Sequence, residues 1–422
     1  MIMPRFRLAM ILCCVLVGTA PLKALAARQG NEAGKAPPAS EPAALAPNWI
    51  GLPAGGGLLS WMERGTGKAV RLRYRTTGPT GFGPPASALE FDDGFVNWAD
   101  VPALAPFKGE GAGKGDGAGP HYLAARLRML GEGTYAYGIS TAHSQDGGVT
   151  WGKPRWLHSD RSESEHGFVT LLPRPSGGLR AFWLDGRGTL AGGPMTLRTR
   201  ALSPAGEWGP EEELDGRTCD CCPTRAVNLK AGRVLVAWRD RSADEVRDMA
   251  YALGTPTESG ALKWSMPRTL HDDGWKIAGC PVNGPALAAP AAGQTGPLAA
   301  AWFTMGRNAR PRVLLALSTN EGESFSAPLT IDGGDPLGRV DLAYAPNGGL
   351  AIVWLEKGEQ GAQWRLRLLE PSGELSAPRT VAEVPAERSS GFARLVPVGG
   401  DLSLVWTRTG RGLGIAELDL SE

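Results

Sequence analysis

Residues 217–241 read RTCDCCPTRAVNLKAGRVLVAWRDR and contain the two features that organise this chain. The second half is an apolar run that ends in Trp238 and continues into a polar tail, and similar runs recur along the sequence. The first half carries three cysteines, Cys219, Cys221 and Cys222, and this group does not recur. The repeated run therefore indicates how the protein is built, whereas the cysteines mark something that the scaffold itself does not require.

The run that ends in tryptophan defines an internal repeat, which is the first feature to look for in a chain of this length. It returns as GLRAFWLDGR, PLAAAWFTMG, GLAIVWLEKG and DLSLVWTRTG, with successive tryptophans 55, 64, 52 and 52 residues apart. GLLSWMERG comes earlier, and HYLAARLRM, from His121, occupies the same place without a tryptophan, which makes seven units. A turn followed by an aromatic residue and proline, as in AGEWGPEEEL, recurs six times between these runs.

Each unit predicts a four-stranded antiparallel sheet with the tryptophan on its second strand. Glycine and proline are frequent (59 and 34 of 422 residues), which favours many turns and an all-β fold. One such sheet buries only part of its apolar surface, so neighbours must stack, and closing the ring protects the edges. We therefore expect a β-propeller of four-stranded antiparallel blades, with seven blades favoured over six. The tryptophans are expected to pack between blades. Because the last unit lacks an outer strand, we expect residues 39–49 to supply it.

The N-terminal segment has the pattern of an export signal. A basic start, an apolar core over residues 8–17 and the small residues Ala24, Leu25 and Ala26 predict a secretory signal over residues 1–26. An Ala/Pro-rich leader is expected over residues 27–47, followed by one propeller domain over residues 48–422. The protein is thus expected to be exported to the periplasm or secreted, and to be a monomer. No later stretch is long enough to span a membrane. The net charge of +1 gives no reason to expect a nucleic acid as partner.

Two hairpin sequences resemble the Asp-box of the sialidase (BNR-repeat) superfamily. SQDGGVTW, residues 144–151, resembles the box closely, and STNEGESF, residues 318–325, resembles it with Asn320 in place of the aspartate. Asp146 is expected to accept backbone N–H bonds across a tight turn, Gly148 to take a positive φ, and Trp151 to anchor the hairpin. The resemblance implies a propeller, but in the superfamily the box lies away from the active centre and does not imply an activity.

Sialidase chemistry, as the resemblance implies it, needs an arginine cluster for the substrate carboxylate, a Tyr–Glu pair and an aspartate acid/base. The Arg-Ile-Pro signature of the superfamily is absent from the first unit, and of the six tyrosines only Tyr344 falls in a predicted inner strand. The sequence therefore favours a binding or accessory protein for a glycan, peptide, metal or other small ligand. The alternative is a glycoside hydrolase of the exo-sialidase type acting on acidic sugars. Its predicted catalytic residues are Arg225, Arg339 and Arg388 as the clamp, with Asp341 or Glu165 as carboxylates.

Functional groups of a propeller gather where the inner strands begin, at one end of the central channel, which we call the channel mouth. Cys280, in IAGCPVNGPAL, falls at the entry of the unit after the three cysteines, so these sulfurs are expected to meet. The residues expected to bind a ligand or form disulfides at the mouth are Cys219, Asp220, Cys221, Cys222, Cys280 and Asn283.

Three interpretations of the cysteines remain open. An even number in an oxidising compartment favours two disulfides, Cys221–Cys222 with Cys219–Cys280 or another pairing. The second is a soft-metal site for Cu or Zn, formed by Cys219, Cys222 and Cys280 with His166. The third is a redox-active thiol pair, because a strained disulfide is easily reduced. No other cofactor is indicated.

Overall fold

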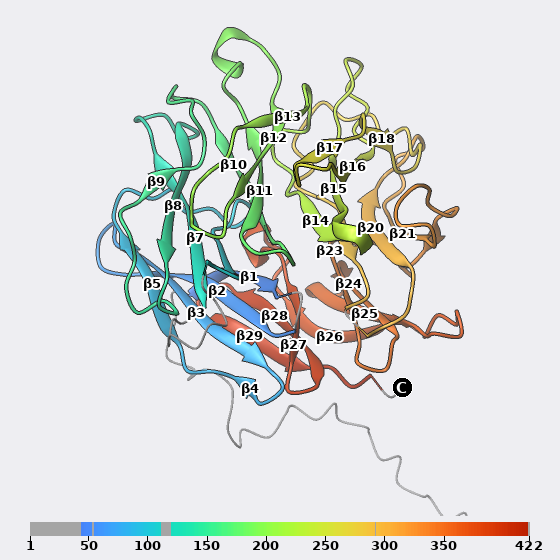
Figure 1. The fold of residues 1–422 in the computed structure, drawn as a ribbon. Coiled ribbons are helices and arrows are strands. Elements are labelled where there is room, and N and C mark those ends of the chain that lie inside the picture. Colours follow the sequence, from blue (N-terminus) through green and yellow to red (C-terminus); the bar gives the residue numbers. More distant parts are fainter. Residues whose placement is uncertain (1–43, 53–54, 111–119, 292, 421–422) are drawn as a thin grey trace, which may run out of the picture. The chain divides into compact units, whose positions relative to one another are not determined.

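The computed structural model describes residues 44–52, 55–110, 120–291 and 293–420, and the chain there forms seven antiparallel sheets arranged around a common axis (Figure 1). The architecture is an all-β propeller with seven blades, as the repeat predicts, and the six-blade alternative is wrong. The expected signal segment over residues 1–26 and the leader up to residue 43 lie outside the described residues. In the described part of the chain, no helix is long and apolar enough to cross a membrane.

Within each blade the strands are paired in chain order from the axis outward. The inner strands are β1 (Ala44–Gly51), β6 (Ala103–Phe107), β10 (His166–Pro173), β14 (Arg225–Asn228), β19 (Ala286–Ala288), β23 (Pro336–Tyr344) and β27 (Arg394–Val398). The second strands are β2 (Gly57–Arg64), β7 (His121–Met129), β11 (Leu179–Asp185), β15 (Val234–Arg239), β20 (Leu298–Thr304), β24 (Leu350–Gly358) and β28 (Asp401–Arg408).

The third strands are β3 (Val70–Gly78), β8 (Tyr137–Ser144), β12 (Thr196–Leu202), β16 (Met249–Pro256), β21 (Arg312–Ser318), β25 (Gly361–Leu369) and β29 (Gly412–Glu417). The outer positions hold β4 (Gly81–Phe82) with β5 (Ala86–Phe91), β9 (Arg155–Trp156), β13 (Glu212–Asp215), β17 (Leu262–Trp264) with β18 (Arg268–Thr269), β22 (Leu329–Thr330) and β26 (Arg379–Val384). The described helical elements are the short 3-10 turns η1 (Thr189–Ala191), η2 (Lys230–Gly232) and η3 (Arg388–Ser390).

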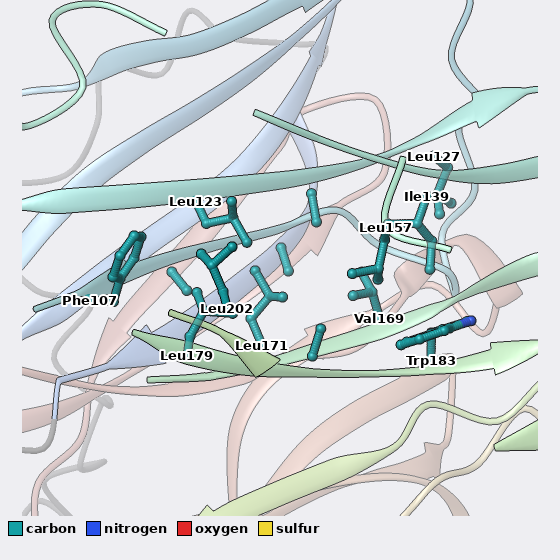
Figure 2. Packing of buried hydrophobic residues seen from close by; sticks show 14 of the residues in the cluster. Phe107, Leu123, Leu127, Ile139, Leu157, Val169, Leu171, Leu179, Trp183 and Leu202 are labelled. Carbon is teal, nitrogen blue, oxygen red and sulfur yellow. The ribbon is translucent and has the colours of Figure 1, made fainter. Parts of the chain in front are cut away.

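The repeated tryptophans pack between blades, as expected. Trp183 on β11 is fully buried and packs with Ile139 and Leu157 of the preceding blade (Figure 2). The same relation to the preceding blade holds around the ring, because each tryptophan shares its apolar cluster with residues of the blade before it. The six tryptophans are Trp61, Trp183, Trp238, Trp302, Trp354 and Trp406.

Five of these tryptophans also donate their indole N–H to a carboxylate, a bond that the sequence pattern did not suggest. A buried indole N–H needs an acceptor, because leaving it without one costs a large part of its lost hydration. The bonds are Trp61–Glu63 at 2.9 Å, Trp183–Asp185, Trp238–Asp215 and Trp354–Glu356 at 2.8 Å, and Trp302–Asp273 at 2.7 Å. Each bond fixes the orientation of a large ring at a blade interface.

The first and last blades close the ring by packing against each other. Residues 39–49 were expected to supply the outer strand of the last blade, and for the described residues from Ala44 onward this prediction is wrong. Strand β1 pairs with β2 as the inner strand of the first blade, and the last blade has three strands in the described part of the chain. The propeller also includes residues from Ala44, which the sequence assigned to the leader. Across the junction, Ala46 N donates to Thr407 Oγ1 at 3.1 Å and Gly399 N donates to Gly78 O at 2.9 Å.

Both sequences that resemble the Asp-box form the hairpin between the third and outer strands of a blade. Asp146 accepts the backbone N–H and the hydroxyl of Thr150, Gly148 has a φ of 88°, and the Trp151 indole donates to Gly148 O. In the second copy, Asn320 Oδ1 accepts the N–H of Ser324 at 3.0 Å. The predicted turn geometry is thus present at both hairpins, on the outer part of the blades.

The Trp354–Glu356 bond can be tested against a matched tryptophan in the same blade. Trp364 on β25 is equally buried, but its indole N–H has no hydrogen-bond partner. Trp354→Phe removes ring volume and a bond to a buried carboxylate, whereas Trp364→Phe removes ring volume alone. We expect Trp354→Phe to lower the free energy of unfolding by about 1.5–3 kcal/mol more than Trp364→Phe, measured by urea denaturation. Equal losses would show that the bond contributes nothing.

Candidate functional site

A cavity of about 300 Å³ lies on the axis, lined by inner strands β1, β10, β14, β19, β23 and β27. Its lining changes along the axis, because Arg225 and Arg394 are the first residues of their strands, whereas Tyr344 and Pro173 are the last residues of theirs. Charged side chains therefore lie at the end nearer the channel mouth. The other end is lined mainly by apolar residues.

Arg225 pairs with the carboxylate of Asp341, and Arg394 lies near both without an ion pair of its own. Arg225 Nη2 lies 3.4 Å from Asp341 Oδ1, and Asp341 Oδ2 accepts the backbone N–H of Leu395 at 2.9 Å. Arg394 is fully buried and bonds to neutral groups, Asn48 Oδ1 at 3.4 Å and Ala393 O at 3.1 Å. Burial, together with the nearby Arg225 guanidinium, lowers the pKa of Arg394 to about 9. The charged end of the cavity thus carries excess positive charge.

Arg339 and Arg388 form a second cationic group at the mouth, on the indole of Trp98. Their guanidinium carbons lie 4.6 Å and 5.6 Å from the Trp98 ring centre, and Arg339 also donates to the carbonyls of Arg388 and Gly391. Phe392 links this group to the cavity, since the guanidinium carbons of Arg339 and Arg394 lie 6.0 Å and 5.7 Å from its ring centre. Burial and the adjacent Arg388 lower the pKa of Arg339 to about 10.

Taken together, Arg225, Arg339, Arg388 and Arg394 are called here the arginine cluster. Of these four guanidinium groups, that of Arg225 has an ion-pair partner, Asp341, and the other three have none among the described residues. Among the residues that the structure describes, no other carboxylate lies within ion-pair distance of these four side chains. The structure thus brings the three predicted clamp arginines to the mouth and adds Arg394.

Several inner strands enter the ring through a bulge. Pairing is interrupted in β1, β10 and β23 near their first residues, and at each break a non-glycine residue has a left-handed backbone: Ala46, Phe168 and Arg339, with φ of 56°, 53° and 57°. Such conformations cost free energy in residues that carry a Cβ, so the surrounding structure must impose them. At Arg339 the backbone N–H is held by Asn283 Oδ1 at 2.7 Å. Asn283, predicted as a binding residue, is buried and thereby supports the position of Arg339.

A Tyr–Glu pair, which the sequence did not reveal, lies at the same end of the ring. The hydroxyl of Tyr137, the first residue of β8, lies 2.6 Å from Glu165 Oε1 and 2.8 Å from Asp100 Oδ2. One hydroxyl hydrogen serves only one acceptor, so this geometry requires a proton on one of the two carboxyls. Burial raises the pKa of Asp100 to about 8 and that of Glu165 to about 7. Asp100 and Tyr137 are buried, whereas Glu165 is partly exposed.

The sulfurs of Cys219, Cys221 and Cys222, called here the cysteine cluster, lie within 4.8 Å of one another. Cys219 Sγ is 3.1 Å from Cys222 Sγ and 3.9 Å from Cys221 Sγ. The neighbouring thiols of Cys221 and Cys222 hold the pKa of Cys219 well below its usual value. Cys280 lies near Cys221, since the two thiols shift each other's pKa, but it is not part of the group of three sulfurs.

The loops that carry these cysteines are in direct contact. A Cβ on Gly284 would lie 1.9 Å from Pro223 O, so only glycine allows the two loops to approach this closely. The four cysteines among the described residues are free thiols, so the two predicted disulfides are not formed in this structure. The closest partner of Cys219 is Cys222, and the predicted partner Cys280 interacts with Cys221 instead. Asp220 turns away from the sulfurs to pair with Arg241 at 3.0 Å.

His166 does not join the cysteines, and its prediction as a metal ligand is wrong. Its Nδ1 lies 3.1 Å from Ser164 O, its Nε2 lies 3.1 Å from Asp160 Oδ2, and its ring stacks on His158. Its Nε2 makes no hydrogen bond, but it lies beside the carboxylates of Asp160 and Asp185, so the imidazole is held inside the blade and away from the sulfurs. His166 is the first residue of inner strand β10, as its place in the repeat predicts. Its side chain is nevertheless buried inside the blade.

The sequence patterns did not identify four residues of the site, namely Trp98, Arg394, Tyr137 and Asp100. Trp98 and Asp100 precede β6, an inner-strand entry that the repeat could have identified, and Arg394 lies in the entry ERSSGFARLV. Tyr137 begins a third strand, and because second strands run toward the mouth, third strands begin there. Tyr344, the tyrosine predicted in an inner strand, lines the cavity at its far end and donates to Pro297 O.

Comparisons with known proteins show the fold. Neither family models nor curated protein sequences match this chain. The BP39L lectin from Burkholderia pseudomallei has a similar structure, with a TM-score of 0.55 and 13% identity over 88% of this chain and 97% of the lectin. A Penicillium chrysogenum alpha-L-arabinanase has a TM-score of 0.46 and 16% identity, over 92% of this chain and 96% of the arabinanase. The Hadza microbial sialidase Hz136 has a TM-score of 0.44 and 16% identity, over 74% of this chain and 63% of the sialidase. At this identity the likeness is one of architecture.

The Tyr137–Asp100 contact predicts a pH-dependent stability. Because the pKa of Asp100 is raised to about 8 in the folded chain, its contribution is complete at low pH and is lost as the pH rises toward 8. Between pH 5.5 and 9 the loss should be on the order of 3 kcal/mol. Asp100→Asn retains a neutral donor and acceptor, so the free energy of unfolding of this variant should change less over that range.

Asp146→Asn provides the control for this measurement. Asp146 is partly exposed, and the Thr150 hydroxyl and N–H lower its pKa to about 2, so it is ionised throughout the range. Its substitution should shift stability equally at pH 5.5 and pH 9. A profile for Asp100→Asn that runs parallel to the wild type would show that Asp100 is already ionised at pH 5.5.

Proposed function

We propose that this sialidase-like propeller is an exported binding protein that takes an acidic glycan at its channel mouth. The observation that carries the proposal is the arginine cluster, in which four guanidinium groups have one carboxylate between them. Planar guanidinium groups bind carboxylates through paired hydrogen bonds, and these bonds are stronger than neutral ones. A ligand carboxylate would supply the counter-charge that the described residues leave out.

The aromatic residues at the mouth support a sugar as the rest of the ligand. Trp98 is partly exposed beside Arg339 and Arg388, and Phe392 lies next to it with ring centres 6.3 Å apart. Aromatic rings provide rigid apolar surface at low entropic cost, which suits the C–H faces of a pyranose. Lectin, arabinanase and sialidase neighbours share the propeller architecture, and this is compatible with a glycan ligand.

A glycan-binding measurement with two charge-removing variants tests this proposal. We expect sialylated and uronic-acid oligosaccharides to bind and their neutral parents not to bind, measured by isothermal titration. Arg388→Gln should raise Kd by about 10-fold or more, because one charge-assisted bond contributes about 1.5–3 kcal/mol. Arg388 is exposed and its guanidinium makes no described hydrogen bond, so the variant should fold normally.

The control is Arg155→Gln, which removes the same charge from the outer strand β9, where Arg155 pairs with Glu207 at 3.5 Å. Its Kd should equal that of the wild type. Equal binding of neutral and acidic sugars, or an unchanged Kd in Arg388→Gln, would contradict the proposal.

A second function, hydrolysis of an acidic glycoside, is favoured by Glu165 alone. This carboxyl is partly exposed, accepts the Tyr137 hydroxyl at 2.6 Å, and has a pKa raised by burial to about 7, which suits a general acid. Asp341, the other predicted carboxylate, is engaged by Arg225 and Leu395 N.

Release of reducing sugar from a panel of acidic oligosaccharides, whose sugar leaving groups must be protonated, decides between the two functions. If Glu165 is the general acid, turnover should fall as the pH rises above about 7, and Glu165→Gln should abolish it while leaving Kd unchanged. Glu163→Gln, on the exposed side of the same loop, is the matched control and should retain full turnover. Absence of turnover in the wild type would leave binding as the function.

A further inference from the structure

We propose that the cysteine cluster binds one Cu(I) ion through Cys219, Cys221 and Cys222. The three sulfurs converge from a single short loop to within 4.8 Å of one another, with two separations of 3.1 and 3.9 Å. Metal–thiolate bonds of about 2.3 Å place the sulfurs of a three-coordinate site about 4 Å apart. Small movements of the side chains would therefore close the triangle around one ion.

The backbone holds these sulfurs in place before any ion arrives. Cys219 N donates to Arg239 O at 3.1 Å, and the preceding residue, Thr218, is buried and donates to Met195 O at 2.9 Å. On the other side of the loop, Thr224 Oγ1 lies 2.8 Å from Thr170 Oγ1. Both ends of the loop are thus anchored, which reduces the entropy lost on binding.

The donor set selects for a soft ion with a low coordination number. Thiolates favour Cu(I), whereas structural zinc almost always takes four ligands. Among the described residues, no imidazole or carboxylate joins the group of three sulfurs. Asp220, the nearest candidate along the chain, is paired with Arg241.

The surroundings suit an anionic metal–thiolate centre. Arg247 Nη1 lies 3.3 Å from Cys219 Sγ and can donate to the thiolate as an outer hydrogen bond. Binding replaces the proton of each thiol by a bond to copper, releases those protons to solvent and leaves the ion as Cu(I). No oxidant or reductant is needed for this step.

Exposure defines the side from which copper enters. Cys219 and Cys222 are each 1% exposed, Cys221 is partly exposed, and Cys280, which lies near Cys221, is exposed. An incoming ion therefore meets the partly exposed Cys221, near which Cys280 lies, before it reaches the buried pair. In this arrangement Cys280 is a transfer ligand and is not needed for the final three-coordinate site.

The proposal is tested by anaerobic titration of the fully reduced protein with Cu(I), supplied as its acetonitrile complex in competition with bicinchoninate. We expect one ion per chain and an ultraviolet thiolate-to-copper band. Cys222→Ser and Cys221→Ser should each weaken binding by more than the roughly 10–100-fold that follows loss of an outer-shell group. Cys280→Ser should retain stoichiometry and affinity while slowing uptake. Since Cys221 is less buried, its variant keeps the test valid if Cys222→Ser does not fold.

Two further measurements give outcomes that would overturn the proposal. The first is a titration with Zn(II). If Zn(II) binds more tightly than Cu(I), and Cys280→Ser weakens that binding, the cysteines form a four-cysteine zinc site instead. Thiol counting on denatured protein from an oxidising compartment should find four free thiols once copper is removed with a chelator. A count of zero would establish two disulfides, and weak Cu(I) binding that is unchanged in Cys222→Ser would show that the cluster holds no ion.

Discussion

The buried indole of the second-strand tryptophans is the constraint on which the ring depends. Each ring fills the space between its own blade and the preceding one, so its size sets how closely two sheets approach. Filling that space with tryptophan also buries an N–H, and a carboxylate must then be placed inside the interface to accept it. In Trp183 and Trp354 the acceptor follows two residues later on the same strand, Asp185 and Glu356. A tryptophan and a carboxylate two residues later therefore fill the interface and also provide the acceptor for the buried indole N–H.

This layer of Trp–carboxylate bonds also supports the channel mouth. Second strands run toward the mouth, and the tryptophans lie in the later part of these strands, just below the loops that carry the functional groups. Asp215 and Asp273, which accept the bonds of Trp238 and Trp302, lie in the segments that lead into the Cys219 and Cys280 entries. The most distinctive loops of the chain are thus anchored directly on the rigid interfaces.

The sequence predicted what repetition encodes. Seven units, tryptophans between blades, the Asp-box turns and the meeting of Cys280 with the earlier cysteines all follow from assigning equivalent residues to equivalent strands. The bulges at Ala46, Phe168 and Arg339 could not be predicted in this way, because none of these left-handed positions is a glycine. A chain position at a mouth entry does not settle where a side chain lies, and His166, at the start of β10, is buried inside a blade.

The spacing of residues in the sequence also cannot predict which of several nearby side chains will contact one another. Four thiols at two neighbouring entries allow several contacts, and only the loop packing at Gly284 and Pro223 decides that Cys280 meets Cys221. The distribution of charge over the surface likewise cannot be predicted from the net charge of the chain. The whole chain has a net charge of +1, yet the arginine cluster gathers at the channel mouth three guanidinium groups that have no ion-pair partner among the described residues. Long-range steering of an anion by the whole protein is therefore weak, and selectivity must come from desolvated guanidinium groups at contact distance, while the nearby sulfurs favour a soft cation.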